Sequence, residues 1–156
     1  MAVLINDEKN VKMTLNFIAN RFLHYEDSRE DFENWIPFEL LLTVEKESYE
    51  YLEKRGATFT LLEAKNLINN LDKIVSEKSG NLNIEKYQFS SSEGFFELAV
   101  DETYENDQVY IELWINVGTY SDGRSFGYDK GFRFVVSVSV LEDFSVGLKS
   151  QLNSIL

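Results

Sequence analysis

The spacing of apolar residues changes period along this chain, and this change restricts the possible folds more than any other feature. In residues 11–17 and 38–44 every second residue is apolar, the pattern of a half-buried β-strand. Residues 61–75 instead place apolar side chains three or four positions apart, on one face of a helix. Alternation returns after Gly80. Because no strand–helix–strand repeat appears, we expect an α+β fold: a mostly antiparallel sheet, one central amphipathic helix and a C-terminal helix.

The expected helices and strands have boundary signals of their own. Thr60 and Glu63 form a capping-box pattern at the start of the central helix, and Gly80 lies just beyond its end. A short strand is expected at Tyr49–Tyr51, closed by a turn near Arg55-Gly56. Four further strands are expected after the helix, over 84–89, 95–101, 108–117 and 132–140. A closing helix is expected from about Glu142, with its apolar side formed by Phe144, Leu148, Leu152 and Ile155.

Length and composition predict the broad class. The 156 residues correspond to one domain, residues 1–156, and 44% apolar residues argue against disorder. The chain has no cysteine, so disulfides and thiolate metal sites are excluded. The N-terminus lacks a basic region and carries only a short apolar run, and no apolar segment approaches the roughly 20 residues that span a bilayer. We therefore expect a cytoplasmic protein.

No residue pattern supports catalysis or a cofactor. His24 is the only histidine and stands beside a run of acids, where a surface role is more common than a catalytic one. The glycines between Gly118 and Gly131 match neither a dinucleotide fingerprint nor a P-loop, so they indicate a long turn between two strands. Paired carboxylates are numerous, but the sequence distinguishes none as an acid–base pair. The sequence predicts no enzyme, no cofactor and no metal site.

The negative charge is concentrated in two stretches. The formal net charge is −12, which disfavours nucleic acid and anionic membranes as partners. Residues 24–53 carry a net charge of −8 and residues 93–112 carry −7, so the remaining chain is +3. Such stretches suit a cationic protein partner, because complementary charge speeds association.

The second stretch combines acids with large aromatic residues. If Phe96, Leu98 and Val100 face the core, alternation places Glu97 and Asp101 on the other face, where Tyr110, Glu112 and Trp114 of the next strand also lie. Consistent faces require an odd residue sum between paired strands, and a sum of 209 would set Glu97 opposite Glu112 and Phe95 opposite Trp114. The predicted partner-binding residues are eight from this region and three acids of the first stretch: Glu97, Asp101, Glu102, Glu105, Asp107, Tyr110, Glu112, Trp114, Glu26, Asp27 and Glu30.

Three other interpretations remain open at this point. The acids could form a merely solvated surface. Tyr110 and Trp114 could pack under another element or against a second copy, giving a homodimer. The chain could also be a ligand-binding or enzymatic scaffold with a pocket between helix and sheet, which would require an enclosed cavity with convergent polar groups.

Several segments together resemble the WapI-type immunity proteins, the antidotes of bacterial contact-dependent polymorphic toxins. The matching features are Asp31-Phe32-Glu33-Asn34-Trp35-Ile36, the strand Phe38 to Val44, the helix from Thr60 through Leu67, and the strand Phe132 to Val140 leading through Leu141-Glu142-Asp143-Phe144 to a helix ending in Gln151-Leu152. Burial statistics favour Trp35 as a core or sheet-edge anchor, with Asn34 turning the chain ahead of it.

The resemblance implies a non-enzymatic antidote that binds the toxin's catalytic domain one to one. Binding would occlude the toxin's active site or hold it in an inactive form. For a nuclease toxin with a basic groove, the acidic and aromatic surface would take the place of phosphate.

Overall fold

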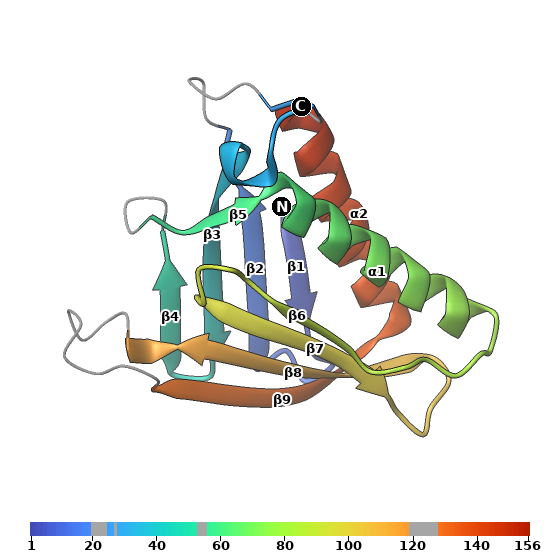
Figure 1. The fold of residues 1–156 in the computed structure, drawn as a ribbon. Helices are drawn as coiled ribbons and strands as arrows, with labels where there is room; N and C mark the ends of the chain where they lie inside the picture. Colours follow the sequence, from blue (N-terminus) through green and yellow to red (C-terminus); the bar gives the residue numbers. More distant parts are fainter. Residues whose placement is uncertain (20–24, 27, 53–55, 119–127) are drawn as a thin grey trace.

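Two antiparallel sheets that run across one another form the body of the molecule, and both helices lie along one side (Figure 1). The computed structural model describes residues 1–19, 25–26, 28–52, 56–118 and 128–156. Sheet 1 has the strand order β1-β2-β3-β4, with β5 also pairing to β3, and sheet 2 has the order β6-β7-β8-β9. The α+β prediction, with its central and C-terminal helices, is confirmed.

Each sheet is formed by strands that are consecutive in the sequence. Sheet 1 is formed by strands from the first part of the chain: β1 (Ala2–Ile5), β2 (Val11–Phe17), β3 (Trp35–Val44), β4 (Glu47–Tyr51) and β5 (Thr58–Thr60). Sheet 2 is formed by strands from the second part: β6 (Tyr87–Ser90), β7 (Phe96–Glu102), β8 (Gln108–Asn116) and β9 (Asp129–Ser137). The helical elements are η1 (Asp31–Glu33), α1 (Leu61–Ser79) and α2 (Val138–Ile155).

The predicted capping box of α1 is confirmed atom by atom. The Thr60 hydroxyl accepts a hydrogen bond from the Glu63 backbone at 3.2 Å, and the Glu63 carboxylate accepts one from the Thr60 backbone at 2.7 Å. The second Glu63 oxygen accepts from the backbone of Ser92 at 2.6 Å, which ties the start of α1 to the β6–β7 turn. The cap therefore also joins the helix to sheet 2.

The predicted boundary between the last strand and the last helix is wrong. Alternating valines continue to Val140, but β9 ends at Ser137 and α2 begins at Val138. The Ser137 hydroxyl accepts a hydrogen bond from the Val140 backbone at 3.3 Å, an N-cap that starts the helix. Three short elements were not predicted, namely β1, β5 and η1.

A cluster of aromatic rings fills the space where the sheets cross. Phe38 of β3 stacks on Phe59 of β5 with ring centroids 4.2 Å apart, and both meet Phe96 of β7 edge-on at 5.8–5.9 Å. The Tyr51 hydroxyl donates a hydrogen bond across the sheets to the Asn116 carbonyl at 2.6 Å. This packing turns the inner face of sheet 2 toward sheet 1 and leaves its other face outside.

Four predictions fall wholly or partly outside the described residues: the surface role of His24, the binding role of Asp27, the Arg55 end of the turn after β4, and residues 119–127 of the glycine-rich turn.

Candidate protein-binding face

The outer face of sheet 2 brings together five of the predicted partner-binding residues. Phe96, Leu98 and Val100 of β7 are buried on the inner face, as alternation predicts. The register then places five of the predicted residues on the outer face: Glu97, Asp101, Tyr110, Glu112 and Trp114. We call this surface, together with the outward residues of β6 and β9 beside it, the open face.

The predicted register between β7 and β8 is wrong by two residues. Glu97 pairs with Trp114, and Ala99 pairs with Glu112, a residue sum of 211 in place of 209. The sum of paired residue numbers is still odd, so the apolar side chains of both strands share one face. Of the registers with an odd sum, the β7–β8 turn favours this one, because the Thr103 hydroxyl donates to the Glu105 and Gln108 carbonyls at 2.8 and 3.0 Å.

Charge on the open face is partly balanced by cations. Glu112 lies opposite Arg133 of β9, with their charged atoms 3.5 Å apart, and Lys86 approaches it at 3.5 Å from the other side. No like-charged partner opposes Glu112, contrary to the sequence prediction. Glu97 is exposed and accepts one hydrogen bond, from the Gln88 amide at 3.1 Å. Among the predicted acids, the uncompensated charge of the face therefore comes from Glu97 and Asp101, not from Glu112.

Trp114 forms a corner of the open face with two acids. Its indole covers Gly131 of β9 so closely that a Cβ there would lie 2.6–2.7 Å from the ring. This contact explains the glycine inside a strand, because any side chain would displace the indole. A groove of about 320 Å³ beside the ring is lined by Glu97, Trp114, Asn116 and Asp129, among others. Asp129 was not among the predicted residues, and only the β8–β9 register brings it here, opposite Asn116.

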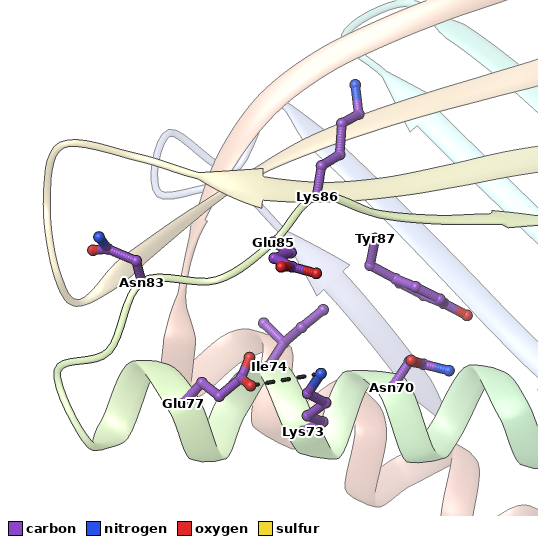
Figure 2. Close-up of a pocket in the computed structure, with 8 residues that line it drawn as sticks. All are labelled: Asn70, Lys73, Ile74, Glu77, Asn83, Glu85, Lys86 and Tyr87. Atoms are coloured by element: carbon purple, nitrogen blue, oxygen red, sulfur yellow. Dashed lines mark ion pairs between the residues drawn. The ribbon is translucent and has the colours of Figure 1, made fainter.

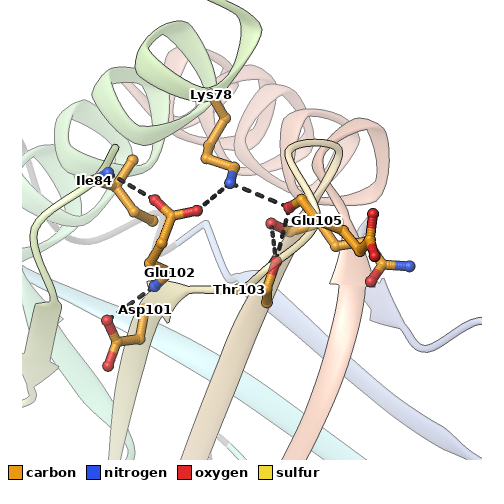
Figure 3. Close-up of polar contacts among 7 residues, drawn as sticks. Lys78, Ile84, Asp101, Glu102, Thr103 and Glu105 are labelled. Carbon is orange, nitrogen blue, oxygen red and sulfur yellow. Dashed lines mark hydrogen bonds and ion pairs between the residues drawn. The ribbon is translucent and has the colours of Figure 1, made fainter. Parts of the chain in front are cut away.

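Glu102 lies on the inner side of the same strand and is held by its own chain (Figure 3). Its carboxylate binds the ammonium of Lys78, a residue of α1 that is only 3% exposed, and accepts from the Ile84 backbone at 2.8 Å. The hydrogen bond from Lys78 and that from Ile84 lower the pKa of Glu102. This acid fastens the end of α1 to sheet 2.

The other two acids of the stretch lie in the β7–β8 turn. The carbonyl of Glu105 accepts from Lys78 at 3.3 Å, and that of Asp107 accepts from the Val138 backbone at 2.7 Å (Figure 3 shows the Glu105 contact). Both side chains are exposed. Their backbones are structural, and their carboxylates face solvent.

The remaining predicted acids, Glu26 and Glu30, belong to the segment before β3. There the buried Asn34 amide donates to the Glu26 carbonyl at 2.7 Å, and the Asp31 carboxylate accepts from the Leu62 backbone at 3.1 Å at the start of α1. Trp35 is half-buried and pairs with Thr60 between β3 and β5. Asn34 and Asp31 therefore anchor this segment, with Asn34 fixing the turn as predicted, while Glu26 and Glu30 are exposed.

A polar groove lies between α1 and the segment that leads into β6 (Figure 2). It measures about 350 Å³ and contains Lys73 and Glu77, whose charged atoms are 3.7 Å apart, together with Glu85 and Tyr87. Burial raises the pKa of Tyr87 to about 12, so its hydroxyl stays protonated near neutral pH and does not act as a base there. The groove is open to solvent and offers no sign of an activated side chain.

Two further observations apply to the described part of the chain. No group of three or more potential metal-ligating side chains gathers there. Neither of its two long helices has the length and apolar character needed to cross a bilayer.

Comparison with known proteins identifies the family. The model of the WapI-like immunity protein family matches residues 4–155, nearly the whole chain. The chain belongs to the WapI-like immunity protein family, which implies a toxin-immunity role and a protein toxin as partner. This confirms the resemblance seen in the sequence.

Other comparisons add little to this result. A search of proteins of curated function finds no match. Among solved structures, "Structure of the plant transcriptional regulator PBF-2" matches with a TM-score of 0.46 and 8% identity, covering 99% of this chain and 83% of that chain. A likeness of that size carries no argument here.

Proposed function

We propose that this chain is a non-enzymatic immunity protein that binds and neutralises a basic toxin domain through the open face of sheet 2. Membership of the immunity family over residues 4–155 is the observation that carries the proposal. The choice of surface rests on the Trp114 corner, where an indole 38% exposed stands beside the carboxylates of Glu97 and Asp129.

This corner has the composition of a binding hot spot. Tryptophan supplies a large, rigid apolar area, and neighbouring acids attract a cationic partner and orient its approach. In the described residues no cation pairs with Glu97, Asp101 or Asp129 at the surface. Glu102 is left out of the proposed surface because Lys78 holds it.

The two alternatives make different demands on the structure. A homodimer through the Tyr110 and Trp114 face would bring two open faces and two chains of charge −12 together, at an electrostatic cost. A ligand-binding scaffold would use the groove beside α1, which is open and mixed in charge. A cationic protein therefore fits the open face of sheet 2 better than a second copy of this chain does.

Growth protection tests the proposed function directly. We would express the C-terminal domain of the secreted toxin encoded beside this chain, with and without the chain, in the same cells. The proposal predicts that co-expression restores growth and that a one-to-one complex elutes from a sizing column. Growth arrest despite abundant, folded chain would contradict it.

A further inference from the structure

The two edge strands of sheet 2 differ in length and in how much of their backbone is available. β6 has four residues, whereas β9 has nine and pairs with β8 without a bulge from Asp129↔Asn116 to Ser137↔Gln108. An edge strand presents a row of unpaired N–H and C=O groups to any extended chain that approaches. β9 is therefore the longer template.

Hydrogen-bond alternation shows which groups of β9 point outward. The Val117 backbone donates to the Tyr128 carbonyl, so Val117 and Tyr128 form a hydrogen-bonded pair. In an antiparallel ladder every second residue pair is hydrogen-bonded, so the pattern continues along β8 and β9 from this pair. The backbone groups of Phe132 and Phe134 therefore face β8, and those of Gly131, Arg133 and Val135 face away from it. Among the described residues, no hydrogen bond is formed by the backbone N–H or C=O groups of these three residues.

β9, as described over Asp129–Ser137, contains neither a proline nor a bulge, two of the usual protections of an edge strand. Natural edges carry a proline, a bulge or a charge pointing along the edge. The only proline of the chain is Pro37 in β3, and the register of β9 is unbroken. Its two cations are both occupied, Lys130 by Glu47 and Arg133 by Glu112.

Acids lie at both ends of this edge. Near Val135, a groove of about 430 Å³ runs between β9 and the β1–β2 turn and is lined by Asp7, Glu8, Arg133 and Val135. Toward the other end, Gly131 lies under Trp114 and beside the groove that contains Glu97 and Asp129. The groove between α1 and the segment before β6 is instead mixed in charge, with Lys73 and Lys86 beside Glu77 and Glu85. Charge complementarity therefore favours a basic occupant on β9.

We propose that the edge of β9 receives an extended, lysine- or arginine-bearing segment of the toxin domain as an added antiparallel or parallel strand, with the Trp114 corner packing beside it. This inference rests on the proposed function and names its binding mode. Backbone hydrogen bonds would supply affinity, and Asp7, Glu8, Glu97 and Asp129 would select a cationic segment. A second copy is the disfavoured occupant, because it carries the same net charge of −12.

Residue-resolved amide exchange tests the docking mode. In the free chain we expect fast exchange at Gly131, Arg133 and Val135 and slow exchange at Phe132 and Phe134. Adding the toxin domain is expected to slow the three outward amides and to leave Gln88 and Ser90 of β6 unchanged. A stable complex in which these three amides still exchange fast would contradict binding at the β9 edge, but it would not contradict the immunity function. If these amides become protected as the concentration of the chain alone rises, the edge binds a second copy of the chain, and the proposed toxin segment is contradicted.

Proline substitution supplies the matched test. Val135→Pro removes an outward N–H, which an edge strand tolerates, and is expected to weaken toxin binding by about tenfold. Val135→Ala removes the same valine side chain but retains the N–H, so it is the matched control and is expected to bind more tightly than Val135→Pro. Equal binding by folded Val135→Pro and Val135→Ala would contradict the inference. Failure of the unmodified chain to protect growth would overturn the proposed function and this inference with it.

Discussion

Glu97 and Glu102 belong to the same acidic strand, yet their surroundings are opposite. Glu97 is exposed on the open face beside Trp114, whereas Glu102 lies on the inner side and binds the buried Lys78. From the sequence, both are predicted to belong to one partner-binding surface. The structure shows that one acid is available to a partner and the other joins α1 to sheet 2, so local charge alone does not locate a binding site.

Removal of each carboxylate should separate these roles most strongly. Glu102→Ala leaves the Lys78 ammonium buried without a counter-charge, and we expect it to lower the free energy of unfolding by about 3 kcal/mol. Glu97→Ala is the matched control from the same strand, with an expected change within about 0.5 kcal/mol. Urea unfolding measures both. Equal losses for the two variants would show that Lys78 does not depend on Glu102.

Truncation of Trp114 should have the next largest effect, on binding. Trp114→Ala is expected to weaken toxin affinity by about 2 kcal/mol, roughly 30-fold, because the ring is the anchor of the corner. Leu41→Ala is a suitable control, since Leu41 is 39% exposed against 38% for Trp114 but lies on the outer face of sheet 1. Titration calorimetry compares them, and a larger loss at Leu41 would move the interface to sheet 1.

Addition of a methyl group under the indole should have a smaller effect, on stability. Gly131→Ala places a Cβ against the Trp114 ring and is expected to cost about 1 kcal/mol and to shift the Trp fluorescence as the ring moves outward. In a Trp114→Ala background the same change should cost much less, because the ring is gone. Equal costs in the two backgrounds would rule out the close contact as the reason for this glycine.

Acid sensitivity gives the smallest difference. Because folding lowers the pKa of Glu102 below its ordinary 4.5, this group contributes stability above that pH and loses it as pH falls through the folded-state pKa. Glu102→Gln lacks the charge at every pH, so its stability deficit should shrink between about pH 7 and about pH 3. Urea unfolding across that range measures the deficit, and a deficit independent of pH would contradict the assignment.

The sequence predicted the elements better than their contacts. Alternation identified β2 and the faces of β7 and β8, and the Thr60–Glu63 pattern located α1, because these signals depend on residues close in sequence. Partners distant in sequence were not predictable. The Lys78–Glu102 pair, the Arg133–Glu112 pair and the Trp114–Gly131 contact each depend on a register or a helix position that turns decide.

The predicted boundary between the last strand and the last helix was wrong because one side chain has more influence there than the apolar spacing. The valines after Ser137 continue the strand spacing, but the Ser137 hydroxyl caps a helix at that point. The β7–β8 register failed for a similar reason, since Thr103 sets the turn. Glu97 and Asp101 were named in advance and Asp129 was not, and which of the named acids face outward required the structure.

Paired charge reversal compares the outer faces of the two sheets as toxin-binding surfaces. Glu97→Lys with Asp101→Lys changes the open face of sheet 2, and Glu39→Lys with Glu50→Lys makes the same charge change on the outer face of sheet 1. With both variants folded, we expect toxin affinity to fall by about 100-fold or more for the first pair and to change little for the second. Full affinity in the first pair, or an equal loss in both, would contradict the open face of sheet 2 as the binding surface.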